Sequence, residues 1–129
     1  MILVDTSVWI QFFRGKDKNL AGELQSLLDS DTVILAAPVR IEILSGCSKT
    51  NLLQLRRLLS ALPLFFPDIA TWQRMDVWIE QAVSAGQQFG VGDLLIASIA
   101  VDQKSLVWSL DSDFIRMKEL GWVNLHNLE

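Results

Sequence analysis

The sequence predicts an α/β fold in which a central parallel sheet is flanked by helices. Short apolar runs that are typical of buried strands alternate with longer segments of helical periodicity. Two of these runs, at residues 2–4 and 106–110, lead directly into aspartates. Sheets of this kind bind their ligands at the carboxyl ends of the strands. At 129 residues, the chain is long enough for one such domain and too short for two.

The first half of the chain shows the expected alternation. Apolar runs predict two strands, at residues 2–4 and 33–36. Helical spacing of apolar side chains predicts four helices, at residues 6–13, 19–28, 38–44 and 51–61. Gly15 ends the first of these helices, and Pro38 opens the third in a first-turn position. This half therefore supplies two strands and the helices that cover them.

The second half contains the longest helices. Residues 64–66 form either a short strand or an extended linker. Helical spacing then predicts a long helix at residues 68–85, whose apolar stripe suits the core or a dimer surface. A helix that is apolar on nearly all sides follows at residues 93–101, and a short helix at residues 114–120. Two further strands are expected, at residues 106–110 and 122–125.

Composition restricts the possible functions. The formal net charge is -4, from 15 acidic and 11 basic residues, which argues against binding nucleic acid by bulk charge alone. Cys47 is the only cysteine and His126 the only histidine, so an internal disulfide or a zinc site is excluded. Half of the residues are apolar, which indicates surface covered by a partner. Without a membrane-length apolar run or a signal peptide, we expect a cytoplasmic protein.

Carboxylates occur where an α/β fold collects functional groups. The candidates are Asp5, Glu42, Asp93, Asp111 and Asp113. Each taken alone is explained by helix capping or by solvent exposure. Together they would repel one another, since two carboxylates 4 Å apart cost about 4 kcal/mol at an effective dielectric of 20. A cluster of oxygen ligands without histidine or cysteine favours Mg²⁺ or Mn²⁺, and these ions support phosphodiester hydrolysis.

Four short motifs, in order, resemble the PIN-domain ribonucleases of VapC-type toxins from bacterial toxin-antitoxin pairs. They are I-L-V-D-T-S-V-W-I, I-E-I-L-S-G, G-D-L-L-I-A and S-L-D-S-D-F, beginning at residues 2, 41, 92 and 109. The resemblance covers residues 1–129. It implies a Rossmann-like PIN fold and cleavage of RNA that depends on Mg²⁺ or Mn²⁺.

The resemblance also implies which residues form the acidic site. Asp5 and Asp93 would bind the metal most directly. Glu42 and Asp111 would complete the coordination or orient the attacking water. We favour Asp111 over Asp113 for the last acidic position because it is nearer the strand end, which leaves Asp113 as a supporting residue or helix cap.

Two hydroxyl groups are expected to support these carboxylates. Thr6 would hold Asp5 by a hydrogen bond, and Ser109 occupies a position where the family often has threonine. RNA would also need cations. The basic residues nearest to the acidic segments along the sequence, which could equally be a solvated rim, are Arg14, Lys16, Arg40 and Lys49. Three further arginines are expected to be ordinary helix surface, namely Arg56, Arg57 and Arg74.

The family implies a homodimer and a small antitoxin, whose tail occupies a groove near the acidic site. Three aromatic residues beside Asp5 suit such a surface, although helical spacing places at least two of them in the core: Trp9, Phe12 and Phe13. One alternative, a phosphoacceptor signalling domain, would need a lysine after a late strand, whereas Lys104 precedes it. The other, a PIN-like module that only binds, is opposed by the intact acidic positions.

Overall fold

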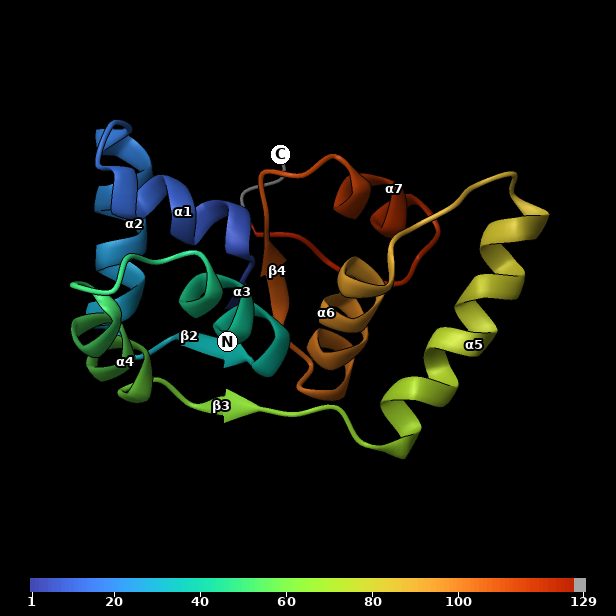
Figure 1. Cartoon of the computed structure of the whole chain (residues 1–129). Helices are drawn as coiled ribbons and strands as arrows, with labels where there is room; N and C mark the ends of the chain where they lie inside the picture. The colour runs from blue at the N-terminus through green and yellow to red at the C-terminus, as the bar shows by residue number, and fades with distance from the viewer. Residues whose placement is uncertain (127–129) are drawn as a thin grey trace.

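The computed structural model describes residues 1–126, which fold around a four-stranded parallel sheet with the strand order β3-β2-β1-β4 (Figure 1). The strands are β1 (Ile2–Val4), β2 (Val33–Ala36), β3 (Leu64–Phe65) and β4 (Leu106–Trp108). The helices are α1 (Thr6–Arg14), α2 (Lys18–Asp29), α3 (Ala37–Ser45), α4 (Leu52–Ser60), α5 (Ile69–Ser84), α6 (Val91–Asp102) and α7 (Asp113–Glu119). The expected parallel α/β architecture is confirmed.

Strand β1 lies in the middle of the sheet and positions the start of the chain. Ile2 is paired with Val33 of β2 and with Leu106 of β4, and every residue of β1 is buried. The pairing continues past the strand, because the Asp5 N–H donates to the Trp108 carbonyl at 2.8 Å. The carboxyl ends of β1 and β4 therefore lie side by side, although more than a hundred residues separate them.

Helix α6 passes through the centre of the fold, as its apolar sequence predicts. Its buried residues are Leu94, Ile96, Ala97, Ser98, Ile99 and Ala100. The helix begins at Val91 after the extended Gly90, two residues earlier than expected. Asp93 therefore lies within the first turn and does not cap the helix.

The two C-terminal strands are shorter than the sequence predicts. Strand β4 ends at Trp108, because the Leu110 N–H donates to the Ser7 hydroxyl and leaves the ladder. In place of the strand expected at 122–125, Leu125 forms a single parallel bridge with Val107. The segment still meets β4, because the Val107 N–H donates to the Asn124 carbonyl and the His126 N–H donates to the Val107 carbonyl, while the Trp122 indole stacks on Trp78 of α5. The uncertain segment at 64–66 does contain a strand, β3.

Helix α5 is joined to α6 by a polar network that involves Arg74. One guanidinium nitrogen, Nη1, donates to the Ser98 carbonyl at 2.9 Å, to the Ser98 hydroxyl at 3.0 Å and to Asp102 Oδ1 at 2.7 Å. The Thr71 hydroxyl donates to the other oxygen of Asp102. The expectation that Arg74 is ordinary helix surface was therefore wrong, because its i, i+3 spacing from Thr71 directs both side chains at α6.

Apolar side chains of α1 and α5 are divided between the core and the surface. Trp9 is buried, Phe12 packs against the core and Phe13 is 40% exposed, in agreement with the expectation that at least two of them are core. On α5, Met75 is buried whereas Trp72 is 47% exposed. Within residues 1–126, no helix combines the length and the apolar character needed to cross a membrane.

Candidate metal centre

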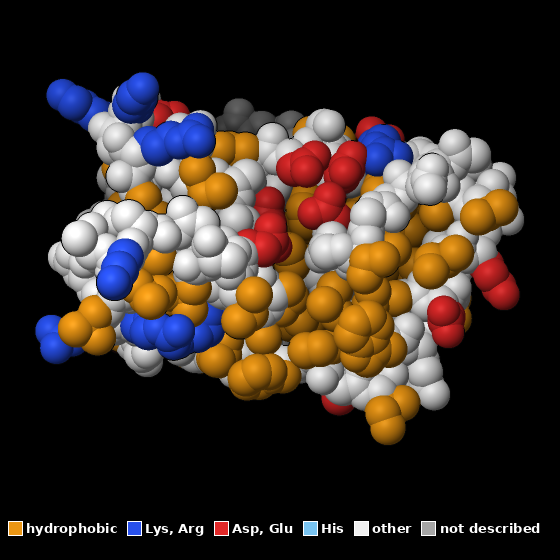
Figure 2. Space-filling model, in the orientation of Figure 1, with side chains coloured by type: hydrophobic (Ala, Val, Ile, Leu, Met, Phe, Trp, Pro, Cys, Tyr) orange, Lys and Arg blue, Asp and Glu red, His pale blue; other side chains and the backbone are white. Residues whose placement is uncertain are grey.

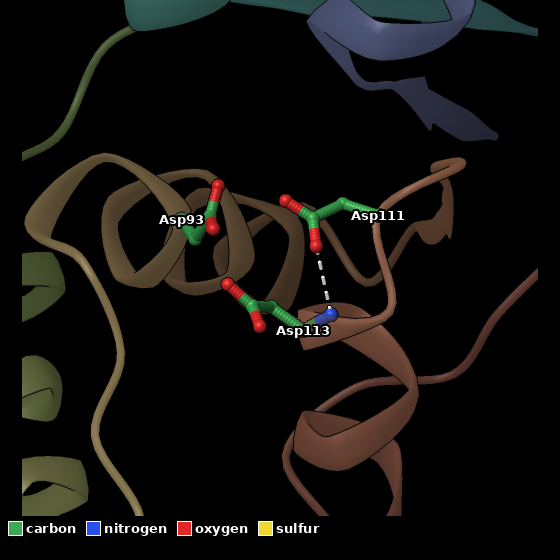
Figure 3. Close-up of side chains that lie close together, drawn as sticks. All are labelled: Asp93, Asp111 and Asp113. Carbon is green, nitrogen blue, oxygen red and sulfur yellow. Dashed lines mark hydrogen bonds between the residues drawn. The ribbon is translucent and has the colours of Figure 1, made fainter.

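Three aspartates converge at the carboxyl edge of the sheet. Asp93 comes from the first turn of α6, Asp111 from the loop after β4, and Asp113 from the first residue of α7. Each side chain offers an oxygen, and these oxygens all lie within 4.8 Å of one another. Figure 3 shows the three carboxylates pointing toward a common space. The sequence-predicted positions Asp93, Asp111 and Asp113 are thus brought together by two helices and a loop.

Asp5 and Glu42 extend this acidic group toward α3. Partial burial and the negative charge of Asp5 raise the pKa of Glu42, while the nearby Thr6 hydroxyl opposes the shift. Asp5 also lies close enough to Asp93 to raise its pKa. Figure 2 shows a group of acidic side chains near the middle of one face, whereas most of the lysines and arginines in view lie toward one end. All five predicted carboxylates therefore belong to one interacting set.

The strongest sign of this crowding is the pKa of Asp93, which is raised to about 7. Burial is the largest cause, followed by the charge of Asp111, a hydrogen bond with Asp113 and the charge of Asp5. A carboxylate in the first turn of a helix normally has a lowered pKa, because the helix dipole stabilises its negative charge. The neighbouring acids therefore outweigh the dipole. Such a shift in a group of like charges is typical of functional sites.

Asp5 is oriented by two serine hydroxyls. Ser7 Oγ and Ser109 Oγ both donate to Asp5 Oδ2, at 2.8 Å and 2.7 Å. The expectation that Thr6 forms this bond was wrong: Thr6 Oγ1 is buried and has no regular hydrogen-bond partner within the described residues. The hydroxyl that donates to Asp5 belongs instead to Ser7, the residue after Thr6, and it lies 3.3 Å from the Ser109 hydroxyl. Sequence reasoning missed Ser7, although its place two residues after Asp5 was a visible signal.

The loop after β4 is ordered by a chain of hydrogen bonds. The Asp111 N–H donates to Ser109 Oγ at 3.0 Å, and the Asp113 N–H donates to Asp111 Oδ1 at 2.9 Å (Figure 3). Asp111, and not Asp113, therefore accepts a backbone N–H at the start of α7. Asp113 instead accepts a hydrogen bond at Oδ1 from Arg116, a residue that sequence reasoning also missed.

The basic residues that were expected near RNA are spread around the site. Arg14 and Glu42 line the same cavity of about 900 Å³, which lies between α1, α3 and α4. Lys16 and Lys49 are exposed and Arg40 is half-buried. Within residues 1–126, no ion pair joins Lys16, Arg40 or Lys49 to the acidic group. Lys16, Arg40 and Lys49 are thus near the acidic residues in sequence but form no ion pair with them in the described part of the fold.

The fold and the site together define an α/β protein with a group of carboxylates at the carboxyl edge of a parallel sheet. The model of the PIN domain family matches residues 2–120. "VapC ribonuclease Mb1587" of Mycobacterium bovis and "Ribonuclease VapC11" of Mycobacterium tuberculosis are each 34% identical over 119 residues, covering 88% of this chain and 89% of each relative. The chain therefore belongs to the PIN-domain family, with curated relatives that are VapC ribonucleases.

Solved structures share the fold at lower identity. FitAB bound to an IR36 DNA fragment contains a chain with a TM-score of 0.82 and 20% identity, covering 100% of this chain and 98% of that one. VapBC2 from Rickettsia felis, bound to a DNA fragment from its promoter, contains a chain with a TM-score of 0.80 and 20% identity, covering 100% of both chains. VapC20 from Mycobacterium tuberculosis, described as a Sarcin-Ricin loop cleaving toxin, has a TM-score of 0.69 and 17% identity, covering 98% of this chain and 99% of that one. These likenesses support the PIN architecture.

Proposed function

We propose that this chain is the toxin of a type II toxin-antitoxin pair and acts as an endoribonuclease that depends on Mg²⁺ or Mn²⁺. The observation that carries the proposal is the convergence of Asp93, Asp111 and Asp113, with oxygens within 4.8 Å of one another, in a family whose curated relatives are ribonucleases. We further infer that residues 1–129 are one PIN domain. We also propose that it acts in the cytoplasm, where it would meet an RNA substrate.

The donor set fits a hard divalent cation. All five candidate side chains are carboxylates, and neither Cys47 nor His126 is among them. Asp5, Asp93 and Asp111 would hold the ion, with Glu42 completing the site and Asp113 supporting it. When bound, such an ion neutralises charge on the phosphate and activates water for attack. The charges of Asp111, Asp113 and Asp5, which contribute to the raised pKa of Asp93, would be offset by such a cation.

The protein's own side chains perform the remaining tasks. Ser7 and Ser109 fix one oxygen of Asp5 and thereby orient its carboxylate. Asp93 would hold the cation as a carboxylate, so that its binding would be coupled to loss of any proton on this group. Glu42, at the edge of the acidic group, would orient the attacking water, and the direction of its pKa shift suits a group that accepts a proton.

The substrate and the antitoxin would meet this face from the same side. Arg14 lies at the cavity shared with Glu42 and is the strongest candidate for a phosphate contact. Lys16, Arg40 and Lys49 would contribute longer-range attraction. The cavity is bordered by apolar side chains such as Phe13 and Leu58, which suit the tail of a small VapB-like antitoxin.

A second apolar area supports the proposed homodimer. Exposed apolar side chains come from α3, α5, α6 and the segment after β3: Ile41, Phe66, Ile69, Trp72 and Val91. Figure 2 shows a broad hydrophobic area over these elements, beside the acidic group. Isolated exposed apolar residues are common, but a contiguous area of this kind indicates association.

The proposal is tested by incubating purified protein with RNA in the presence of Mg²⁺, Mn²⁺ or a chelator. We expect cleavage only with the metals, and loss of cleavage in Asp5→Asn. Asp76→Asn is the matched control, because Asp76 is an exposed carboxylate on α5. Cleavage in the chelator, or full activity of Asp5→Asn, would overturn the metal-dependent assignment. In cells, growth arrest by wild type but not by Asp5→Ala, relieved by the neighbouring small gene, would test the toxin role.

A further inference from the structure

One cation contacts the acidic group directly. The Arg116 guanidinium donates through Nη2 to Asp113 Oδ1 at 2.6 Å, and the two side chains are about one-third exposed, at 35% and 31%. Arg116 is one turn after Asp113 on α7, a spacing that brings the two side chains together.

The guanidinium is held by the segment that leads into α6. Its Nη1 donates to Gln87 Oε1 at 2.5 Å, and its Nη2 also donates to the Gln88 carbonyl at 3.4 Å. Its central carbon lies 4.2 Å from the centre of the Phe89 ring, over the ring face. Residues 87–89 come directly before Gly90, the cap of the helix that carries Asp93. Arg116 thus connects Asp113 to the segment that leads to Asp93.

This arrangement distinguishes Arg116 from a surface ion pair. A guanidinium that only paired with Asp113 would use one edge and leave the rest in water, and it would contribute little. Here its donors and its ring face are engaged by four neighbouring residues: Asp113, Gln87, Gln88 and Phe89. A planar group bound at several points has a fixed position, and it fixes the carboxylate it holds.

We propose that Arg116 is a positioning residue of the metal centre, which holds Asp113 against Asp93 and Asp111 and so increases the affinity for the divalent cation. The inference rests on the proposed function, because it assumes that this acidic group binds the metal. Partners that orient metal ligands typically change metal affinity by about 10–100-fold when they are removed. Loss of a nearby positive charge acts in the opposite direction, by about fivefold at most for a partly exposed group. The positioning effect is the larger of the two.

The test is calorimetric titration of Mn²⁺ into the full-length protein, without RNA. We expect Arg116→Ala to weaken binding by about 10-fold or more. Lys118→Ala is the matched control, because it removes an exposed positive charge from the same helix, and it should stay within about twofold of wild type. Arg116→Lys keeps the charge but cannot form the paired contacts, and we expect it to recover only part of the affinity.

A double-variant cycle separates positioning from a general structural effect. If Arg116 acts through Asp113, Asp113→Asn weakens Mn²⁺ binding to a similar extent, and adding Arg116→Ala to it causes no further loss beyond about twofold. Additive losses would show that Arg116 does not act through Asp113 and would overturn the proposal. Binding by Arg116→Ala that equals that of Lys118→Ala, or exceeds that of wild type, would also overturn it.

Failure of the metal site itself gives a different result. If wild type binds no Mn²⁺ in this titration, the proposed function fails, and the role of Arg116 fails with it. If wild type binds Mn²⁺, Asp93→Asn abolishes that binding and Arg116→Ala leaves it unchanged, the metal site stands and only the positioning role is lost. Thermal melting of each variant, followed by circular dichroism, verifies that the titrated protein is folded.

Discussion

The two ends of helix α6 carry aspartates in opposite electrostatic surroundings. Asp102, the last residue of the helix, pairs with Arg74 at 2.7 Å and accepts a hydrogen bond from Thr71. Asp93, in the first turn, faces Asp5, Asp111 and Asp113. The helix dipole alone would favour Asp93 and disfavour Asp102. The neighbouring side chains reverse this order, so tertiary contacts decide which carboxylate stabilises the fold.

The comparison separates a structural carboxylate from the one that we propose to bind the metal. The charge of Asp102 is satisfied by the protein, and its contacts join α5 to α6. The charge of Asp93 is opposed by the protein, and its pKa rises to about 7 as a result. Unrelieved repulsion between carboxylates, as around Asp93 but not around Asp102, is typical of sites that bind a ligand. The following predictions test this contrast.

The largest expected effect is on RNA cleavage. Asp93→Asn removes an oxygen anion from the proposed metal centre, and we expect activity to fall by at least about 100-fold, more than the loss typical of residues that only support a metal ligand. Asp102→Asn lies at the far end of the helix and should retain activity within about threefold at a temperature where it is folded. Initial rates with a fluorescent RNA measure both. Similar losses in the two variants would remove the distinction between the two ends.

The next effect is on folding stability. Breaking a fully buried ion pair costs about 3–5 kcal/mol. Because the side chains of Arg74 and Asp102 are 27% and 19% exposed, we expect Asp102→Ala to lower the free energy of unfolding by about 2 kcal/mol. Urea denaturation at pH 7 in the presence of a chelator measures the change. Asp76→Ala, on the exposed side of α5, should remain within about 0.5 kcal/mol of wild type. A loss of similar size in that control would contradict the network's role.

The raised pKa of Asp93 should make stability depend on pH. Between pH 4 and 7 the folded chain keeps a proton on Asp93 that the unfolded chain releases, because the folded pKa is about 7 and the ordinary value is 3.8. The unfolded state therefore binds fewer protons, and stability decreases as the pH rises through this interval. Discounted for partial exposure, the change is about 1–2 kcal/mol.

This pH effect has a direct test in metal-free protein. Urea denaturation at pH 5, 6, 7 and 8 should show wild type losing stability toward pH 7. Asp93→Asn should flatten the profile and be at least as stable as wild type at pH 7. A loss of stability in Asp93→Asn at pH 7 would indicate that Asp93 stabilises the helix start and does not oppose folding.

The smallest expected effect concerns the two hydroxyls that follow Asp5. Ser7→Ala leaves Asp5 with one of its two serine donors, and we expect RNA cleavage to fall by about 3–10-fold, in keeping with the loss of one hydrogen bond to a charged group. Thr6→Val preserves shape and removes no regular hydrogen bond, so activity should change by about twofold or less. A larger loss in Thr6→Val than in Ser7→Ala would restore the original assignment of Thr6.

Local patterns predicted those parts of the fold and site that depend on neighbours in sequence. The runs at β1 and β2, and the apolar helix α6, are recognisable because their periodicity reflects which faces are buried. The aspartates at the ends of β1 and β4 followed from the rule that parallel strands present their carboxyl ends at one edge. The strand expected at 122–125 was wrong: only a single bridge between Leu125 and Val107 forms there, and the apolar run alone does not distinguish a bridge from a strand.

The sequence by itself determined the parallel α/β class, the positions of the acidic residues and the resemblance to PIN-domain ribonucleases, because each depends on periodicity or on short motifs. Only the tertiary structure decided which side chains donate hydrogen bonds to the aspartates. Ser109 reaches Asp5 across 104 residues, and Arg74 reaches Asp102 across 28. The pKa of Asp93 rises because segments distant in sequence place their carboxylates around it. Contacts of this kind are set by chain packing, which local sequence patterns do not encode.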